Sequence, residues 1–339
     1  MGAQFSSEEL VRVLSHYDIG IVHRVRPLEA GDRRAAKVVI KADKGTFLLK
    51  RRPHGADDLV RVNLAHAVQR HLTAKSFPIP SLLATGTEGS TVLSLENHIY
   101  EFFHFVEGSR YEGSAEETRE AGRQLAVFHK SLADFDAPDE PSPWCFHDSA
   151  MVRQHLGMLA SDQRTLASRQ MKVLAEALLL RYDKSSARAN LLGFASWKRQ
   201  IIHGDWHPGN LLFAGGSVVA VVDFDSIRVS PPVTDLANGM LQFSIVGGGP
   251  DPSDWSSHFA EDRLFDFLNG YREIIRLSER KRYGLVDLMI ETMIAEAVLP
   301  VAATGFFGRH AGFDWLLMIL RKTKWLRHHR RDLRDKMLA

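Results

Sequence analysis

A short β-rich segment inside a helical region constrains this chain more than any other feature. Residues 200–224 read as short apolar strands joined by polar residues, whereas the apolar spacing on both sides of them, from about residue 113 to residue 337, is that of helices. The first strand ends in a loop that contains Asp205 and Asn210, and a later strand ends at Asp223. Because a hairpin returns the chain to its starting edge, we expect these polar side chains to lie together.

The first part of the chain, to about residue 105, has a different pattern, typical of an antiparallel sheet with one long helix. Apolar residues at helical spacing predict that helix within residues 56–75, after a short helix at about 6–16. We expect roughly five strands around it, three of them within residues 19–51 and two more near 91–95 and 98–103. The sequence therefore predicts an α+β fold.

We expect two lobes, because 339 residues are many for a single hydrophobic core. The change of pattern divides the chain into an N-terminal lobe, residues 1–104, and a mainly helical C-terminal lobe, residues 105–339.

Composition narrows the choice of partners and compartment. The net charge is only +2, so composition gives no reason to expect a nucleic-acid partner. The single cysteine, Cys145, excludes an intramolecular disulfide and is typical of a reducing cytoplasm. No stretch approaches 18 uncharged apolar residues, so we expect no membrane span and a cytoplasmic protein.

The three polar residues of the β-rich segment have the chemistry that phosphoryl transfer requires. A hard cation such as Mg²⁺ prefers oxygen ligands, one or two of them from protein and the rest from phosphates and water. Asn210 offers an amide oxygen and Asp223 a carboxylate for such an ion. Asp205 is then left to orient an acceptor hydroxyl and to receive its proton.

The order of these residues resembles that of the aminoglycoside phosphotransferase superfamily. The resemblance rests on His-Gly-Asp-x-His-x-x-Asn at 203–210, followed by Asp-Phe-Asp at 223–225. Further segments match in the family's order, at 46–50, 77–80, 100–108, 122–129 and 235–237. The superfamily also includes choline kinases, type II homoserine kinases, methylthioribose kinases, spore-coat CotS-like proteins and a bacterial stress-response Ser/Thr protein kinase. It is distantly similar to protein kinases.

The resemblance implies a two-lobed, protein-kinase-like fold and a kinase that uses ATP and Mg²⁺. The N-terminal lobe would bind the nucleotide, and the C-terminal lobe would supply catalysis and the acceptor site. Asp205 would be the base, while Asn210 and Asp223 would hold the metal ion. Asp225 would either contact a second metal ion or be purely structural. The nucleotide would contact Lys50 and the segment between the lobes, Phe103, His104, Phe105 and Val106.

Two neighbouring residues are expected to support the catalytic loop. His203 is expected to hold it through hydrogen bonds. The spacing of His203 and His207 is also found in zinc sites, but the Pro208-Gly209 pair directly after His207 and the lack of cysteine ligands argue against zinc. Asp235 is expected to cap the following helix and to brace the loop.

Two departures from the family pattern concern the phosphate-binding side. A glycine-rich loop that covers the phosphates would lie at residues 29–35, but this segment has a single glycine, Gly31. In protein kinases a glutamate of the N-lobe helix pairs with the lysine, but the predicted helix has no glutamate. Either Asp57 or Asp58 replaces it, or Lys50 lacks this partner. We expect Lys50 to stay unpaired until ATP arrives, since residues at the start of a helix point away from its middle turns.

The acceptor is expected to bind in the C-terminal lobe. Glu291 and Glu296 lie in an otherwise apolar run, 288–301, and are the candidates for contact with the acceptor. Acidic residues favour an amine-bearing acceptor among the hydroxyl-bearing small molecules of the superfamily: an amino alcohol, amino acid, sugar or aminoglycoside. A Ser/Thr protein kinase of the stress-response type and a non-catalytic pseudokinase are the alternatives. Residues 226–234 are short for an activation segment, which favours a small molecule.

Overall fold

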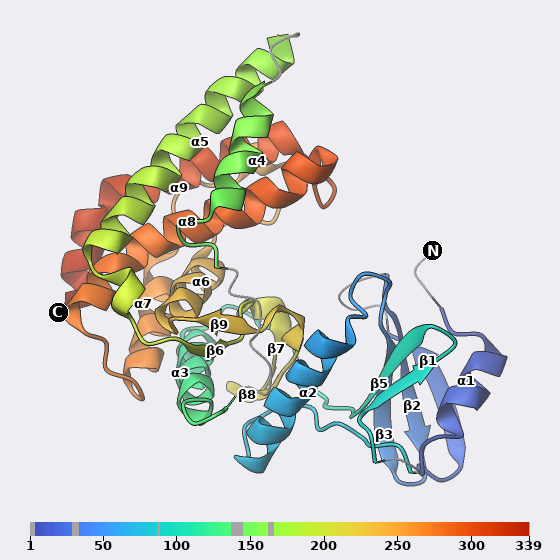
Figure 1. Cartoon of the computed structure of the whole chain (residues 1–339). Coiled ribbons are helices and arrows are strands. Elements are labelled where there is room, and N and C mark those ends of the chain that lie inside the picture. The colour runs from blue at the N-terminus through green and yellow to red at the C-terminus, as the bar shows by residue number, and fades with distance from the viewer. Residues whose placement is uncertain (1–3, 29–33, 87–88, 137–144, 162–165, 339) are drawn as a thin grey trace. The chain divides into compact units, whose positions relative to one another are not determined.

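The computed structural model describes residues 4–28, 34–86, 89–136, 145–161 and 166–338 (Figure 1). The chain separates into two compact units. The first unit comprises Met1–Glu112, Lys130–Pro141 and Gly209–Ile227, and the second unit comprises Gly113–His129, Ser142–Pro208 and Arg228–Ala339. The β-rich segment 200–224 is thus divided between the two units after Pro208. The loop expected near residues 29–35 lies largely outside the described residues.

The first unit contains the expected antiparallel sheet (Figure 1). Its strand order is β1-β2-β3-β5-β4, and each neighbouring pair is antiparallel. The strands are β1 (Val22–Pro27), β2 (Ala36–Ala42), β3 (Gly45–Arg51), β4 (Val92–Leu95) and β5 (His98–His104). Two helices accompany them, α1 (Ser7–Leu14) and α2 (Leu59–Ala74). The predicted five-stranded sheet with one long helix is confirmed.

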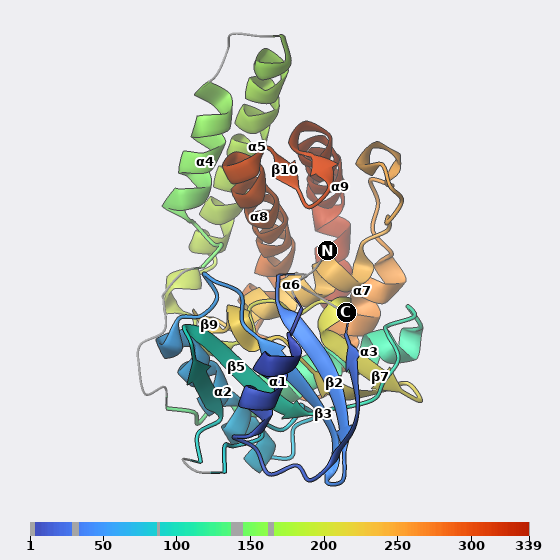
Figure 2. The ribbon, with the colours of Figure 1, turned by 90° about the vertical axis from the view of Figure 1, so that its right-hand side faces the viewer.

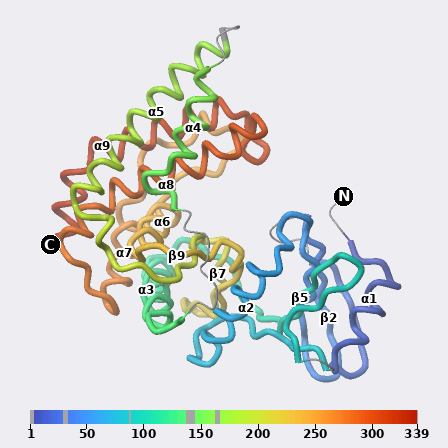
Figure 3. The backbone as a smooth tube through the Cα atoms, in the orientation of Figure 1, coloured from blue at the N-terminus to red at the C-terminus, as the bar shows by residue number. Residues whose placement is uncertain are grey.

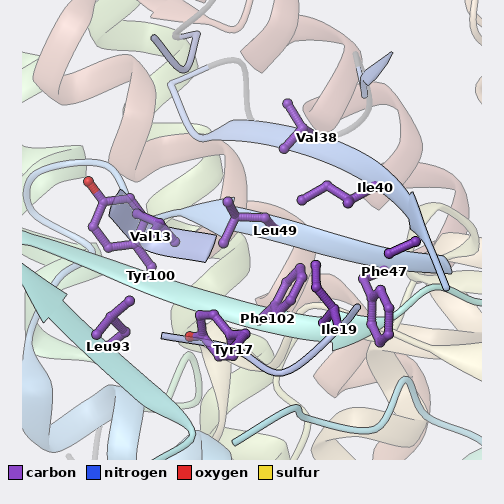
Figure 4. Close-up of a cluster of buried hydrophobic side chains, with 11 residues drawn as sticks. Val13, Tyr17, Ile19, Val38, Ile40, Phe47, Leu49, Leu93, Tyr100 and Phe102 are labelled. Carbon is purple, nitrogen blue, oxygen red and sulfur yellow. The ribbon is translucent and has the colours of Figure 1, made fainter. Parts of the chain in front are cut away.

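The sheet has an apolar face that forms the core of the first unit. Leu49 of β3 packs there with Tyr100 and Phe102 of β5, and Figure 4 shows them in one cluster with side chains of α1 and β2. Successive side chains of a strand point to opposite faces. Lys50, which follows Leu49, and Glu101, which lies between the two aromatic residues, therefore face away from this cluster.

Helix α1 begins with the capping box that the sequence predicts. Ser6 is the N-cap and accepts a hydrogen bond from the Glu9 N–H, while the Glu9 carboxylate accepts one from the Ser6 N–H. Glu9 also joins the helix to the sheet, because its Oε1 accepts from Arg51 Nη1 at 2.6 Å and from the Tyr100 hydroxyl at 2.8 Å. An ion pair thus lies on the core side of the sheet.

A separate hairpin completes the first unit. Its strands are β7 (Leu211–Ala214) and β8 (Ser217–Val221), which pair antiparallel. Main-chain hydrogen bonds join β8 to Pro78, and Phe213 of β7 to Ser109, at 2.8–3.0 Å. The hairpin is therefore tied to the segments that follow α2 and β5.

The second unit is mainly helical, as predicted. Its helices are α3 (Ala115–Ser131, whose last two residues belong to the first unit), α4 (Ala150–Ser161), α5 (Leu166–Leu191), α6 (Val233–Ser244), α7 (Glu261–Arg272), α8 (Glu279–Thr304) and α9 (Gly312–Leu338). Two short strand pairs join them, β6 (Gln200–Ile202) with β9 (Arg228–Ser230), and β10 (Phe306–Phe307) with β11 (His310–Ala311). Helix α8 packs against α4, α5, α6 and α9 (Figure 2).

Apolar residues at helical spacing predict one helix over about residues 149–183, but the structure has two helices there. Helices α4 and α5 pack against each other, as their neighbouring tubes in Figure 3 show. Helical periodicity continues through both elements and so does not reveal the reversal of direction between them. Within the described residues, no helix combines the length and the apolar character that crossing a membrane requires.

Two glycines allow α3 and α7 to cross at close range. A Cβ atom at Gly122 would lie 1.9 Å from a backbone oxygen of α7, and one at Gly270 would lie 1.8 Å from a backbone oxygen of α3. Neither position can accept a side chain at this separation. The crossing places His129 of α3 beside Tyr271 of α7, whose hydroxyl is 2.9 Å from His129 Nδ1.

Candidate active site

Lys50 of β3 is paired with two carboxylates of the first unit. It stands directly opposite Glu101 of β5 in the strand register. Its Nζ is 3.4 Å from Glu101 Oε2 and 3.3 Å from Asp225 Oδ2. Burial by itself would lower the pKa of Lys50, but the two carboxylates outweigh burial and raise that pKa above its usual value. The prediction that Lys50 stays unpaired until ATP arrives is therefore wrong.

Glu101 is the centre of this group of charges. Its side chain is only 3% exposed, its Oε2 accepts from Arg52 Nη1 at 2.7 Å, and its Oε1 is 2.9 Å from His66 Nε2. Burial would raise the pKa of Glu101, but Lys50, the hydrogen bond with His66 and Arg52 together hold that pKa well below its ordinary value. Glu101 is thus an ionised carboxylate with partners on both oxygens.

The two aspartates that were the alternative partners of Lys50 have other roles. Asp58 is the N-cap of α2 and accepts a hydrogen bond from the Val60 N–H at 3.0 Å. Asp57 accepts one from the Gly55 N–H at 2.9 Å. In protein kinases the carboxylate partner of this lysine comes from the N-lobe helix. The sequence analysis therefore considered residues of that helix and missed Glu101, which lies in a strand. One signal was available: a glutamate inside an apolar strand, at a position on the face away from the core.

Asp225, the second acid of the Asp-Phe-Asp segment, belongs to the same group of charges. It lies in the short 3₁₀ turn Phe224–Ser226. Its Oδ1 accepts from Arg52 Nη2 at 2.6 Å, and its Oδ2 accepts from Lys50. Each carboxylate oxygen of Asp225 is therefore already in contact with a cation, one with Arg52 and the other with Lys50.

Asp223 and Asn210 lie at one end of the β7–β8 hairpin. Asn210 directly precedes β7, and the Val222 N–H donates to its carbonyl oxygen at 2.9 Å. The next residue, Asp223, is exposed and has a φ of 66°, a left-handed conformation that residues other than glycine rarely adopt. Asp223 also contributes to the raised pKa of Lys50. The hairpin thus brings the carboxylate of Asp223 into the electrostatic reach of that lysine.

The segment expected to contact the nucleotide base ends the sheet. Phe103 and His104 are the last residues of β5. The Phe105 N–H donates to the Thr46 carbonyl of β3 at 2.9 Å, which fixes the exit of the chain from the sheet. Val106 follows as a half-buried residue.

In the second unit, buried Asp235 holds the loop that follows β6. The N–H groups of His203 and Gly204 donate to its two oxygens at 2.7 and 2.9 Å, and His129 Nε2 is 3.3 Å from one of them. Burial would raise the pKa of Asp235, but the hydrogen bond and the charge of His129, followed by the charges of His203 and Arg228, lower it. Asp235 braces the loop as expected, but it is not the cap of α6, whose N-cap is Pro232.

Asp205 follows this braced segment and is partly exposed. Its N–H donates to His203 Nδ1 at 3.3 Å, so His203 holds the loop through a hydrogen bond, as expected. Its carboxylate is 3.5 Å from His207 Nε2. Arg228 of β9 donates to the Gly204 carbonyl at 3.0 Å and fixes the loop from the other side.

The two acceptor candidates on α8 have different surroundings. Glu291 is fully buried; it contacts His147 Nδ1 at 3.0 Å and accepts from the Asp148 N–H at 3.1 Å. Glu296 is half-buried and accepts from Gln242 Nε2 of α6 at 2.9 Å. Glu291 is thus engaged inside the helical unit, whereas Glu296 reaches partial exposure.

Glu296 also lies within the electrostatic reach of Asp205. Burial, and after it the negative charge of Asp205, raise the pKa of Glu296 to about 7, although Arg228 and His207 partly offset them. Burial and like charge together disfavour its ionised form. A positively charged group placed here would favour that form.

A sequence model described as the phosphotransferase enzyme family matches residues 24–274, more than half of the chain. The chain belongs to this family. The predicted family is therefore confirmed, and the match supports the prediction of an enzyme of the kinase or phosphotransferase class. The match spans the sheet, α2, the β7–β8 hairpin and the Asp205 loop.

Among the curated proteins, the chain is similar to a homoserine kinase from Zymomonas mobilis subsp. mobilis. It is 24% identical to the chain over 225 residues, which make up 66% of this chain and 64% of the homoserine kinase. The chain therefore spans slightly less than two thirds of that relative.

Several solved structures share the fold of this chain. A microcompartment-associated aminopropanol kinase superposes with a TM-score of 0.71 at 13% identity, covering 97% of this chain and 98% of that one. An amicoumacin kinase in complex with AMP-PNP and Ca²⁺ has a TM-score of 0.68 at 14% identity, covering 98% and 94%. A choline kinase from Cryptosporidium parvum has a TM-score of 0.62 at 14% identity, covering 98% and 97%. These likenesses confirm the predicted protein-kinase-like fold class.

Proposed function

We propose that this phosphotransferase uses ATP and Mg²⁺ to move the γ-phosphate onto a hydroxyl group of a small molecule. The observation that supports it most is the ion-paired Lys50 beside the Asn210–Asp223 end of the hairpin. Binding of a nucleoside triphosphate needs a fixed cation for its phosphates and hard oxygen donors for its metal ion. In this proposal residues 1–104 bind the nucleotide, and residues 105–339 supply catalysis and the acceptor site.

Asn210 and Asp223 fit a magnesium ion by the chemistry of their donors. Both offer oxygen ligands, and protein sites for Mg²⁺ use one or two such ligands with phosphates and water completing the shell. Asp225 fits less well, because both its oxygens already contact Lys50 and Arg52. When bound, the ion would neutralise charge on the phosphates.

The remaining residues position the reactants in this proposal. Lys50 contacts the α- and β-phosphates, and the segment Phe103–Val106 contacts the base. Asp205 accepts the proton of the acceptor hydroxyl. The oxygen of that hydroxyl bonds to the γ-phosphorus, while the bond between the γ-phosphorus and the bridging oxygen of the β-phosphate breaks and ADP leaves. Asp235 supports this role because its bonds to the loop fix the main chain just before Asp205.

The acceptor in this proposal carries a positively charged nitrogen as well as a hydroxyl. Half-buried Glu296 supports it, since an ammonium group would add to the counter-charge that Arg228 and His207 supply only in part. The similar proteins are named after homoserine, aminopropanol and choline, and each of these compounds carries both groups. We do not include Glu291 in the acceptor site, because its carboxylate is fully buried against His147 and Asp148.

The test is purified protein with ATP and Mg²⁺ and a panel of acceptors, followed by ADP release and by mass spectrometry of the products. The panel contains amino alcohols, hydroxy amino acids, aminoglycosides, neutral sugars and a protein mixture. Phosphorylation of an amine-bearing alcohol is the expected result. Labelling of protein alone would favour the protein-kinase alternative, and nucleotide binding without any turnover would favour a pseudokinase.

A further inference from the structure

Glu101 is built into the sheet in a way that fixes its carboxylate. It belongs to β5, the neighbour of β3, and stands opposite Lys50 in the register. The residues on either side of it, Tyr100 and Phe102, are buried in the core on the other face of the sheet. The direction of the Glu101 side chain therefore depends on the sheet itself and on no helix movement.

Helix α2 contributes a histidine to this site, not a carboxylate. His66 lies in the middle of α2 and is 1% exposed. Its Nε2 is 2.9 Å from Glu101 Oε1, and its Nδ1 is 2.8 Å from Thr91 Oγ1. A carboxylate oxygen can only accept, so Nε2 is the donor. Lys50 contacts the other oxygen of the same carboxylate, so Glu101 stands between the helix and the lysine.

Arg52 extends the contact from Glu101 to the metal-binding segment. Its guanidinium is 4% exposed and joins Glu101 Oε2 at 2.7 Å to Asp225 Oδ1 at 2.6 Å. Its Nε also donates to the Ala56 carbonyl at 2.5 Å, which fixes the plane of the guanidinium. Asp225 lies two residues after Asp223, so the same arginine also positions the turn that follows the proposed metal ligand.

We propose that Glu101 of β5 is the positioning residue for Lys50, in the role for which protein kinases use a helix glutamate, and that Arg52 couples this pair to Asp225. This inference rests on the proposed function of Lys50 in binding nucleotide. Because β3 and β5 are hydrogen-bonded neighbours, the pair is already formed in the protein without nucleotide. An incoming phosphate then replaces Asp225 at Lys50, while Arg52 retains Asp225.

The test compares nucleotide affinity with thermal stability, using the Mg²⁺ complex of AMP-PNP as the probe. Glu101→Gln keeps the size of the side chain but removes its charge, so Lys50 and Arg52 lose the buried one of the two carboxylates that they share. We expect affinity for the probe to fall about tenfold or more, the usual scale for a charge-assisted contact. In the full reaction, we expect the KM for ATP to rise more than kcat falls.

The matched control is Glu9→Gln in the same unit. Glu9 pairs with Arg51, next to Lys50 in the chain but on the core side of the sheet. This variant removes a partly buried ion pair as well, so we expect a lower thermal midpoint with unchanged affinity for the probe. Equal losses of affinity in both variants would mean that Glu101 acts only through stability, and would overturn the inference.

A second variant restores the charge from the helix. His66→Glu combined with Glu101→Gln moves the carboxylate to α2, at a side chain that lies 2.9 Å from the Glu101 carboxylate. We expect this double variant to recover most of the lost affinity, and the comparison stands even where Glu101→Gln alone folds poorly. Recovery of the thermal midpoint without affinity would overturn the inference. Normal affinity for the probe in folded Glu101→Gln would overturn the inference about Glu101 and leave the proposed function standing. A wild-type protein that does not bind the probe would overturn the proposed function as well.

Discussion

The Lys50 group and the Asp205 loop hold their charged residues in opposite ways. In the first, two cations, Lys50 and Arg52, share the carboxylates of Glu101 and Asp225. In the second, a single buried carboxylate, Asp235, accepts main-chain N–H groups and fixes the loop backbone. Side-chain ion pairs can exchange partners when a phosphate arrives, whereas main-chain hydrogen bonds keep one geometry. The first arrangement suits the binding of a charged ligand, and the second suits the placing of a reactive group.

The largest effect is expected from Asp205→Asn. This change keeps size and polarity but removes the proton acceptor, so kcat should fall by a factor on the order of 10²–10⁴. Affinity for the nucleotide should be largely retained, because Asp205 faces the acceptor in the proposed function. Steady-state kinetics and calorimetry with the Mg²⁺ complex of AMP-PNP measure the two effects. Unchanged turnover would show that another residue takes the proton.

Asp235→Asn tests whether the loop depends on one buried carboxylate. An amide has a single acceptor oxygen, so its NH₂ group would face the N–H of His203 or Gly204. We expect the free energy of unfolding to fall by about 3 kcal/mol, the scale for breaking a buried charged network, together with a lower kcat. Denaturant titration measures the first. Asp251→Asn is the control, since Asp251 is an exposed cap in the same unit and asparagine is also a good cap.

Lys50→Ala tests the first arrangement. Glu101 and Asp225 each lose one cation, and Glu101 is almost fully buried, so we expect the free energy of unfolding to fall by about 1–3 kcal/mol. Nucleotide affinity should fall as well. Thermal unfolding without nucleotide decides the point. A midpoint equal to that of Lys44→Ala, which removes an exposed lysine paired with Asp18, would show that Lys50 is not held by its carboxylates.

The smallest effect concerns pH and Glu296. Its pKa of about 7 lies above the ordinary carboxyl value, so its charged form increases as pH rises through 7. An ammonium acceptor binds that form, so KM for the acceptor should fall as pH rises from 6 towards 8, by up to about tenfold per pH unit below the pKa. Since the unfolded chain loses this proton at lower pH, the same group should make the unliganded protein less stable as pH rises towards 7.

Glu296→Gln is the matched variant for this pH dependence. It keeps the hydrogen-bonding capacity towards Gln242 but cannot ionise, so both pH dependences should become flat near pH 7. A pH profile that is identical in wild type and variant would remove Glu296 from the proposed acceptor site. The Asp205 chemistry would be unaffected by that result.

Much of the fold could be predicted because its signals are local. The five strands, α2 and the β7–β8 hairpin follow from periodicity and turn residues, and the Asp205 loop is one contiguous motif. The division of residues 149–183 into α4 and α5 could not be predicted, since helical spacing says nothing about a reversal of direction. The bracing of the loop by Asp235 could be predicted, but its expected role as the cap of α6 is wrong, because Pro232 is the N-cap.

The sequence by itself determined most of the order of elements and the family, because these depend on short-range spacing. Tertiary structure decided which residue holds Lys50. Glu101 became that partner only because β5 pairs with β3 in one register, and pairing between strands distant in sequence leaves no local signal.

Two glutamates of α8 show the same division. Glu291 and Glu296 have the same side chain and lie on one helix, yet packing buries Glu291 against His147 and leaves Glu296 half-buried beside Gln242. Only the packed structure supplies the surrounding charges and the solvent access of each side chain. These surroundings engage Glu291 with His147 and Asp148 and raise the pKa of Glu296 to about 7.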